Sequence, residues 1–437
     1  MSESVEKSEV REGYKEVQLS PKTVRIPEKW EVVKTNSVSE KITDGTHNSP
    51  NTVDEGYPYI TSKNVRENGF RLDDIGYISK EDHKKIYSRC DPQPGDVLYV
   101  KDGANTGIAR KNTLDFEFSL LSSVAQIRTD QERLDPDFLT HHLNWPLFKK
   151  VMQSKMSGTG ITRLTVTKIK NSEILLPPIL EQRYIADILS TVDKQIQQTD
   201  EMIEKTEELK QGLMQDLITG GIDHSSYKPA QLGPKEVDIP DTWEVERMND
   251  VAEIVSGGTP KKSTGEYWGG NIVWVTPTDV TGTAGMYISD SAEKITQEGL
   301  DNTSTYLLEP GAVLMTSRAT IGEAVINTVP ATTNQGFKSL VPEDRMHNEY
   351  LYYYVRTIAN YLTEIGGGST FPEINKTDTE NVRVPVPPLD EQKRIANVIN
   401  QAYKKRLEEQ EYKQRLQELK HGLMQDLLTG KVRVNTD

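Results

Sequence analysis

A twelve-residue sequence that occurs twice constrains this chain more than any other feature. Residues 209–220 read LKQGLMQDLITG and residues 419–430 read LKHGLMQDLLTG, identical at ten of twelve positions. A related pair precedes the two copies, LPPILEQRYIADIL from Leu176 and VPPLDEQKRIANVI from Val386, at the same spacing of 210 residues. With 437 residues the chain is long enough for two or three domains, and the repeat predicts two similar halves.

A long helix is predicted between each Pro-Pro pair and the Thr-Gly that follows it. The ~40 intervening residues lack proline and are rich in Glu, Gln, Lys and Leu, a composition typical of a solvent-exposed helix. A glutamate in the first turn suits the helix dipole, and Gly220 or Gly430 suits a left-handed cap at the end. We therefore expect long spacer helices over residues 181–220 and 391–430.

A narrow apolar stripe runs along each of these helices, and it is too narrow for either helix to be stable alone. Arg406 and Lys413 occupy positions that are isoleucine in the first copy, so the middle of the pairing is expected to be weaker. The residues expected to pair the two helices are Ile185, Leu189, Val192, Ile196, Ile203, Leu213, Ile395, Ile399, Ala402, Leu416 and Leu423.

Opposite net charge also favours pairing of the two helices with each other. Residues 181–218 carry nine acids and four bases, whereas residues 391–428 carry six acids and eight bases. Leu209 and Leu419 fall on the apolar stripe as well. The sequence therefore predicts an antiparallel coiled coil that forms within one chain.

The overall composition excludes several classes of protein. The net charge of −14 argues against a broadly basic nucleic-acid binder, although a local basic face is compatible with it. The single cysteine, Cys90, excludes an internal disulfide and is expected to be a partly buried, unreactive side chain. Residues 1–20 lack the apolar run of a signal peptide and no segment resembles a membrane span, so we expect a cytoplasmic protein.

Each half opens with a similar motif, IPEKWEV from Ile26 and IPDTWEV from Ile239. In both halves short strand-like segments then alternate with polar loops, a helix-like segment follows, and a last strand leads into Pro-Pro. The acidic residues of the second motif resemble a nuclease carboxylate pair, but the counterpart in the first copy favours a strand entry. We therefore predict an α+β fold with two similar mixed α/β domains, each followed by a long helix.

No catalytic or metal-binding motif is discernible in the two copies. The chain lacks a phosphate-binding GxxxxGK[ST] loop, an HExxH helix, a Cys/His cluster and an amino-methyltransferase tetrad, so no metal site is expected. His47 lies in a DGTH turn with no partner carboxylate or nucleophile visible in the sequence, which favours a loop contact over a general base.

Polar loops in equivalent places of both halves carry the side chains that phosphates and base edges require. For any one of these residues a solvated surface role is more common, but the set recurs in both copies. The candidate DNA contacts are Thr46, His47, Asn48, Lys63, Asn64, Arg66, Lys101, Asn105, Arg110, Thr162, Arg163, Lys168, Thr259, Lys261, Lys262, Thr276, Thr278, Arg318, Thr320, Asn334, Gln335, Lys338, Ser369, Thr370, Asn375 and Lys376.

These features together resemble the specificity subunit of Type I restriction-modification enzymes. The likeness covers nearly the whole chain and rests on PP-x-x-EQ and LK-x-GLMQDL-x-TG at the helix ends, and on SGGTPKKSTGEYWGGNIVWVTPTDV and DGTHNSP with YPYITSKNV inside the halves. It implies that each globular half is a target-recognition domain for one half of a bipartite asymmetric DNA site. The paired helices would fix the spacer and dock two methyltransferase subunits, with restriction subunits added outside them.

The resemblance also implies that the chain is non-catalytic and binds no cofactor. S-adenosylmethionine, ATP and Mg would then belong to the partner subunits. From the positions of the motifs, the expected divisions are a flexible tail (1–23), target-recognition domain 1 (24–180), spacer helix 1 (181–220), a linker (221–236), target-recognition domain 2 (237–390), spacer helix 2 (391–430) and a tail (431–437).

A non-DNA adaptor, with two protein-binding heads on a coiled-coil rod, is the alternative function, and the acidic net charge favours it. Positive faces directed at a common groove would distinguish a DNA reader from such an adaptor. A combined methyltransferase and specificity protein is excluded because the catalytic motifs are missing.

Overall fold

The chain divides into two compact units, each containing a globular part and a segment of two long helices. Unit 1 comprises residues 1–201 and 410–437, and unit 2 comprises residues 202–409. Helices α5 (Ile179–Gly220) and α11 (Leu389–Leu427) contribute one segment to each unit. The computed structural model describes residues 12–19, 22–156, 163–367 and 372–435, among which no helix is long and apolar enough to cross a membrane.

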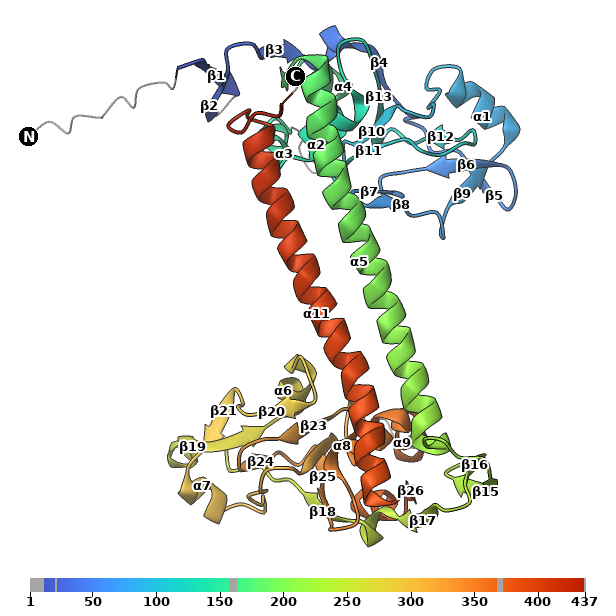
Figure 1. Cartoon of the computed structure of the whole chain (residues 1–437), viewed down its shortest axis with the longest axis vertical. Helices are drawn as coiled ribbons and strands as arrows, with labels where there is room; N and C mark the ends of the chain where they lie inside the picture. The colour runs from blue at the N-terminus through green and yellow to red at the C-terminus, as the bar shows by residue number, and fades with distance from the viewer. Residues whose placement is uncertain (1–11, 20–21, 157–162, 368–371, 436–437) are drawn as a thin grey trace, which may run out of the picture. The chain divides into compact units, whose positions relative to one another are not determined.

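Unit 1 is built on two four-stranded sheets with short helices beside them (Figure 1). One sheet has the order β11–β10–β13–β4, from β4 (Ser39–Asp44), β10 (Val97–Val100), β11 (Ala109–Lys111) and β13 (Val124–Thr129). The other has the order β12–β6–β9–β5, from β5 (Thr52–Val53), β6 (Tyr57–Ile60), β9 (Gly76–Ile78) and β12 (Ser119–Leu120). Three pairs are β1 (Tyr14–Leu19) with β2 (Lys22–Pro27), β3 (Glu31–Lys34) with β14 (Glu173–Leu176), and β7 (Val65–Arg66) with β8 (Gly69–Phe70). The helices are α1 (Lys80–Tyr87), α2 (Pro136–Asn144), α3 (Pro146–Ser154) and α4 (Val166–Lys170).

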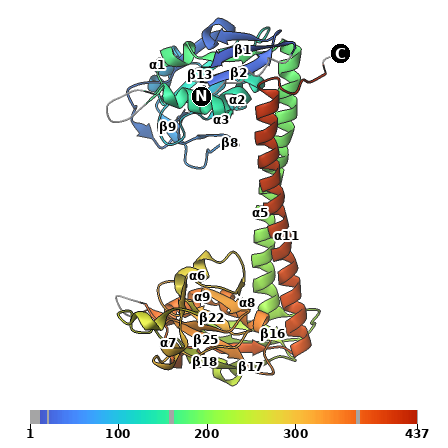
Figure 2. The same ribbon diagram turned by 90° about the vertical axis from the view of Figure 1, so that its left-hand side faces the viewer.

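Unit 2 repeats this plan with a larger main sheet (Figure 2). That sheet has the order β18–β25–β22–β23–β20, from β18 (Ala252–Ser256), β20 (Tyr287–Ile288), β22 (Val313–Thr316), β23 (Ala324–Asn327) and β25 (Phe337–Pro342). A second sheet has the order β21–β19–β24, from β19 (Trp268–Val275), β21 (Glu293–Ile295) and β24 (Ala331–Thr333). Two pairs are β15 (Tyr227–Leu232) with β16 (Lys235–Pro240), and β17 (Glu244–Arg247) with β26 (Arg383–Val386). The helices are α6 (Pro277–Gly282), α7 (Gln297–Asp301), α8 (Asn348–Thr357), α9 (Ala359–Gly366) and α10 (Lys376–Glu380).

Two β-hairpins, β1–β2 and β15–β16, replace segments that the sequence predicted to be a flexible tail and a linker. The prediction is wrong for residues 14–19, 22–23 and 227–236. Each strand of the two hairpins has only two apolar side chains that stand two positions apart, such as Val17 and Leu19 or Val237 and Ile239, among charged or polar residues that hide the pattern in the sequence. Leu19 and Ile26 are buried in the core of unit 1, and Ile239 is buried in the core of unit 2.

The buried tryptophan of each opening motif donates a hydrogen bond to the glutamate of the following PP-x-x-EQ motif. Trp30 Nε1 donates to Glu181 Oε2 at 3.0 Å, and Trp243 Nε1 donates to Glu391 Oε2 at 3.1 Å. The second carboxylate oxygen of Glu181 accepts from Arg433 Nε at 2.6 Å. Because both motifs carry the same pair, they fix the start of each long helix against its own globular part.

The glutamine of the same motif fixes the helix start through backbone groups. Gln182 Nε2 donates to Arg133 O and Pro177 O at 2.8 Å each, and Gln392 Nε2 donates to Arg345 O and Pro387 O at 2.8 Å each. Both glutamine side chains are fully buried. The amide oxygen of each glutamine also accepts from a backbone N–H, that of Asp135 or His347. A buried amide with three partners is costly to replace, which explains why this dipeptide recurs at the two helix starts.

Left-handed glycines follow the ends of both long helices. Gly430 has φ +68°, as predicted, but Gly220 is the last residue of α5 and the left-handed residue is Gly221, also with φ +68°. A Cβ on Gly221 would lie 2.7 Å from the Trp243 ring, and one on Gly430 would lie 2.5 Å from the Pro27 ring. Glycine is therefore required at both positions by conformation and by space.

The long helices are antiparallel, as predicted, in each unit taken by itself (Figures 1 and 2). In unit 1, Asp193 lies 2.7 Å from Lys420, and Asp200 lies 2.5 Å from Lys413. As residue numbers rise along α5, they fall along α11. In unit 2, the segment that follows α5 lies beside the start of α11, since the Ile222 backbone N–H donates to Glu391 at 3.1 Å.

Ion pairs take the place of apolar contacts at the two weak positions of the helix pairing. Lys413 pairs with Asp200 in unit 1, and Arg406 pairs with Glu207 at 3.1 Å in unit 2. All four side chains are partly buried, which makes such pairs more effective than exposed ones. The contacts that the sequence predicted to be weak are therefore polar contacts between complementary charges.

All eleven residues predicted to pair the helices are buried or half-buried. Several of them pack into the globular cores as well: Ile185 and Leu189 belong to the core of unit 1, and Ile395 and Ile399 belong to the core of unit 2. Leu209 and Leu419 are exposed, at 57% and 51%, so placing them on the buried stripe was wrong. The stripe drifts around a straight helix, because 3.6 residues per turn do not match a strict heptad.

Two adjacent histidines of α2 are buried in unit 1. Burial lowers the pKa of His141 to about 4 and the pKa of His142 to about 3. Neither ring nitrogen of His142 has a hydrogen-bond partner in the described part of the chain, and its ring packs beside Phe138 and Phe148. Because an unfolded histidine titrates near 6.5, the unfolded chain binds more protons than the folded chain below that pH.

Unit 1 is therefore expected to lose stability as the pH falls from 6.5 towards 4. The loss is about 1 kcal/mol per histidine between pH 6.5 and 5.5. Thermal melting of the full chain checks this, and His142→Phe, which removes one titrating ring, should reduce the slope. His421→Gln, at an exposed histidine of the same unit, is the control and should keep the wild-type profile. A wild-type slope in His142→Phe would contradict the assignment.

Candidate nucleic-acid interface

Several loops of unit 1 meet at one edge of the β11–β10–β13–β4 sheet. Because neighbouring strands are antiparallel, the end of β4, the start of β13 and the end of β10 lie together. Thr46 follows β4 and Lys101 follows β10. The backbone N–H of Leu164 donates to Lys101 O at 2.9 Å, which brings Arg163 to the same edge.

The loop after β6 joins this edge through hydrogen bonds of Ser62. Its backbone N–H donates to Ser123 Oγ at 3.1 Å, and its carbonyl accepts from Asn105 Nδ2 at 3.0 Å. Arg66, on β7, also donates to this carbonyl, at 3.4 Å. Predicted contacts that lie far apart in the sequence are thus brought together in unit 1.

Unit 2 gathers the equivalent loops at the ends of β18 and β22 and the start of β25. Thr259 donates a hydrogen bond from its hydroxyl to Gln335, which joins the loops after β18 and before β25. Arg318, after β22, lies 2.9 Å from Glu373. The same edge of the main sheet therefore carries the candidate residues in both units.

A glycine after the first strand of each main sheet lets these loops approach closely. A Cβ on Gly45 would lie 1.8 Å from Leu120 O, and one on Gly257 would lie 2.0 Å from Asn334 O. No side chain fits at either distance. The glycines in DGTH and SGGTP are therefore structural, and they shape the loops that carry the polar residues.

Three of the predicted DNA contacts have buried side chains. Asn64 Oδ1 accepts from a backbone N–H three residues earlier at 2.9 Å, and Lys101 Nζ lies 3.3 Å from Asp44 Oδ2. Lys338 Nζ lies 3.9 Å from Glu373 Oε1, and burial lowers its pKa against the opposing effect of that carboxylate. Because these groups are enclosed and paired, we expect them to support the loops rather than to reach a nucleic acid.

The remaining candidates differ in exposure. The exposed ones are His47, Asn48, Lys63, Arg163, Lys261, Lys262, Thr278, Arg318, Thr320, Gln335, Asn375 and Lys376. The half-buried ones are Thr46, Arg66, Asn105, Arg110, Lys168, Thr259, Thr276 and Asn334. Thr162, Ser369 and Thr370 lie outside the described residues. Lys168 lies on α4 rather than on a loop at the sheet edge. Several exposed bases have carboxylate neighbours: Lys63 lies 3.0 Å from Asp74, and Lys262 lies 3.5 Å from Glu293.

An aromatic pair beside Lys262 was missed by the sequence analysis. Lys262 Nζ lies 5.4 Å from the centre of the Trp268 ring and 5.9 Å from that of Trp274, and the two rings meet edge to face. Trp274 is held by a 3.0 Å hydrogen bond to Gly258 O, whereas Trp268 is half-exposed. An aromatic ring next to a base is a surface on which a nucleobase can stack. The EYWGG segment was the available signal, because a tryptophan between polar residues and glycines is unusual.

His47 belongs to a small network of charged side chains. A carboxylate does stand near it, Asp44 at 3.4 Å, but Asp44 is shared with Lys101 and with Arg89 at 3.6 Å. Cys90 is buried, as predicted, and burial raises the pKa of its thiol to about 12. Within the described ranges, no three His, Cys, Asp or Glu side chains are grouped as metal ligands.

Comparison with known proteins agrees with this geometry. The model of one protein family, described as "Type I restriction modification DNA specificity domain", matches residues 27–208 and 240–420. The "Type I restriction enzyme MjaIX specificity subunit" of Methanocaldococcus jannaschii is 40% identical over 178 residues, 40% of each chain. The "Putative type I restriction enzyme MjaX specificity subunit" of the same organism is 26% identical over 440 residues, 97% of this chain and 98% of that one.

Solved structures share the fold. One from a study of "complex assembly" and "conformational transition of the type I R-M system" is 20% identical, with a TM-score of 0.60, and covers 93% of this chain and 99% of that one. The "Type-I restriction-modification system S subunit from M. genitalium" is 15% identical, with a TM-score of 0.54, over 93% of this chain and 97% of that one.

Proposed function

Because the chain belongs to the family of Type I restriction-modification DNA specificity domains, we propose that it is the sequence-specificity subunit of such a system. Each unit reads one half of a bipartite asymmetric DNA site. The paired helices set the unspecified spacer between the half-sites and dock methyltransferase subunits. A two-headed adaptor for other proteins is not favoured, because it would not explain the family membership.

The observation that carries this proposal is a common loop framework with different side chains. In unit 1 the Leu164 N–H donates to Lys101 O at 2.9 Å, and in unit 2 the Ile374 N–H donates to Ser317 O at 3.0 Å. The residue before the bonded N–H is the exposed Arg163 in unit 1 and the half-buried Glu373 in unit 2. Because base discrimination depends on side chains, the two units are expected to read different half-sites.

The acidic net charge is compatible with this function. Nine acids lie on residues 181–218, within helix α5, and not on the loops at the sheet edges. The exposed bases of the loops can neutralise phosphates locally, while aromatic and amide side chains contact the bases.

The partners in this proposal are double-stranded DNA, two methyltransferase subunits and restriction subunits. The chain supplies binding and positioning only. It holds no cofactor and catalyses no step, so S-adenosylmethionine, ATP and Mg belong to the partner subunits.

The full chain should direct DNA methylation only together with a methyltransferase subunit of the same system. The measurement is the sequence of methylated positions in DNA from cells that express both proteins, the methyltransferase alone, or this chain alone. We expect one bipartite asymmetric sequence with both proteins and no methylation with either alone, because the sequence of this chain contains no methyltransferase motif. Methyl transfer by this chain alone, or methylation independent of sequence, would contradict the proposal.

A further inference from the structure

The tip of the β7–β8 hairpin is held by charged groups from three helices of unit 1. Glu67, at the tip, lies 2.9 Å from Lys149 of α3 through Oε2 and 3.1 Å from Lys420 of α11 through Oε1. Lys420 also lies 2.7 Å from Asp193 of α5. This set of four residues, the ionic brace, connects a loop of the globular part to both long helices.

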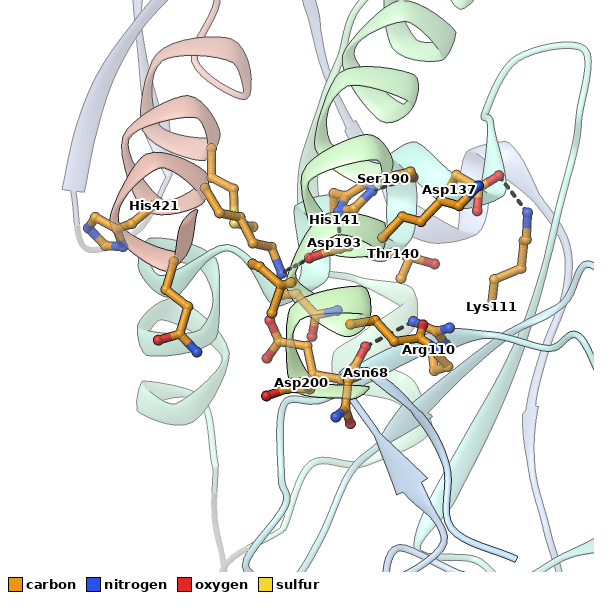
Figure 3. A pocket seen from close by; sticks show the side chains of 18 of the residues that line it. Asn68, Arg110, Lys111, Asp137, Thr140, His141, Ser190, Asp193, Asp200 and His421 are labelled. Atoms are coloured by element: carbon orange, nitrogen blue, oxygen red, sulfur yellow. Dashed lines mark hydrogen bonds and ion pairs between the residues drawn. The ribbon is translucent and has the colours of Figure 1, made fainter. Parts of the chain in front are cut away.

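The brace lines a polar cavity of about 680 Å³ between the globular part and the helices (Figure 3). Asp193 and His141 point towards each other in it, and Arg110 and Asn68 border it from the side of the hairpin. The guanidinium of Arg110 donates to Glu67 O at 3.0 Å, which fixes the backbone of the tip as well. The cavity is therefore crossed by contacts that tie its two walls together.

The charges of the brace stabilise one another in partly buried surroundings. Burial acts to raise the pKa of Glu67, but the positive charges of Lys420 and Lys149 outweigh it and hold the pKa below its usual value. Burial acts to lower the pKa of Lys420, but the carboxylates of Asp193 and Glu67 outweigh this effect and raise the pKa above its usual value. Lys420 has a side chain only 13% exposed, so removing one partner leaves a poorly hydrated charge.

The hairpin depends on this brace because its own ladder is very short. Only Val65 with Phe70 and Arg66 with Gly69 are paired between its strands. A two-stranded ribbon of this length is not stable by itself. Val65 is buried in a core cluster and Phe70 packs against it, which fixes the base of the hairpin, and the contacts of Glu67 decide where the tip lies. Arg66, next to Glu67, is one of the candidate DNA contacts.

Unit 2 has a brace at the equivalent helix positions, with different chemistry. Asn400 and Tyr403 stand 210 residues after Ser190 and Asp193. Asn400 Nδ2 donates to Glu349 at 2.7 Å and its Oδ1 accepts from Tyr353 at 2.5 Å, while the hydroxyl of Tyr403 donates to Ala284 O. Both units therefore tie the globular part to α11, through ions in one and through hydroxyl and amide groups in the other.

We propose that Glu67 is a positioning residue for DNA recognition by unit 1, and that it holds the Arg66 hairpin in its reading position through Lys420 of helix α11. This inference rests on the proposed function. It makes recognition of the first half-site dependent on a residue of the helix repeat that itself touches no base. In unit 2, Tyr403 of α11 holds the loop that contains Ala284, and recognition of the second half-site is expected to depend on this contact in the same way.

The test is the methylation of DNA sites with single mismatches in one half-site or the other, by the full chain with its methyltransferase partner. Glu67→Gln should raise methylation of sites mismatched in the first half-site by roughly tenfold, because one base contact is worth about 1–3 kcal/mol. Discrimination in the second half-site should stay unchanged. Lys420→Gln should also relax the first half-site, and the double variant should be no worse than Glu67→Gln alone, since both variants break the Glu67–Lys420 pair.

Two matched variants control for structural damage. Glu81→Gln breaks the exposed pair with Lys85 in the same unit and should leave both half-sites unchanged. Tyr403→Phe should relax the second half-site only. The melting temperature of each variant is measured as well. If Glu67→Gln or Lys420→Gln does not fold, Lys149→Gln replaces it, because Lys149 is the other partner of Glu67.

Unchanged discrimination in Glu67→Gln and Lys420→Gln, or equal relaxation of both half-sites, would overturn the positioning role while leaving the proposed function intact. Failure of the wild-type chain to direct methylation to a bipartite site would instead overturn the proposed function.

Discussion

A chain that carries the second recognition segment twice should read an inverted repeat of its second half-site. The change replaces Ile26–Pro178 by a copy of Ile239–Pro388 and leaves both long helices in place. Methylation of sites that contain the original first half-site should fall by at least about 100-fold, because several base contacts of 1–3 kcal/mol each are lost together. The measurement is again the sequence of methylated positions.

The structure shows why such a transplant should fold. Trp243 of the copied segment replaces Trp30 as the partner of Glu181, and Gln182 bonds only backbone groups of the globular part. The brace must move with the segment, so Ser190→Asn and Asp193→Tyr are introduced to supply the partners that unit 2 takes from Asn400 and Tyr403.

The outcome separates independent reading from joint reading. If the units read separately, the transplant no longer recognises the first half-site and recognises the second half-site in both orientations. Persistence of any base preference from the original first half-site would mean that the helices or the second unit contribute to it. The transplant without the two helix substitutions is the matched control, and it should fold less stably.

The repeat made the architecture predictable from the sequence. Motifs at both ends of each long helix fixed its length to within a few residues, and complementary charge indicated that the two helices pair. The contacts made by the motif residues were not predictable, because Trp30 and Glu181 are 151 residues apart in the sequence and meet only in the folded chain. The spacing of residues in a sequence shows the periodicity of a single helix or strand, whereas the hydrogen bond between Trp30 and Glu181 joins two different elements.

The candidate interface was predictable as a set of loops but not as a set of contacts. Polar residues in equivalent loops do converge at one sheet edge in each unit, yet Lys101 and Lys338 are enclosed there. Glu67 and Lys420 gave no sign of their pairing, since they are 353 residues apart. Residue type predicts what a side chain can bind, whereas burial decides whether a ligand can reach it.

A chain that ends after Ser225 should form a two-fold dimer that reads an inverted repeat. In the full chain, Met424 of α11 and Leu428, which follows this helix, complete the core of unit 1, and Arg433 pairs with Glu181. The shortened chain lacks these residues and exposes that core as a monomer. It keeps Met214 and Ile218, which stand 210 residues before Met424 and Leu428, so a second copy can supply them.

The shortened chain should therefore melt at a temperature that rises with protein concentration, and light scattering should give twice the mass of one chain. Because a two-fold pair presents two identical units, methylation with the partner subunit should select an inverted repeat of the first half-site. Ile218→Asp should abolish the dimer, because this side chain is fully buried in unit 2 of the full chain. Leu209→Asp, at the exposed leucine nine residues earlier, is the control and should leave the dimer intact. A folded monomer of the shortened chain would show that the C-terminal segment is dispensable for unit 1, against the burial of Leu428 and the pairing of Arg433 with Glu181.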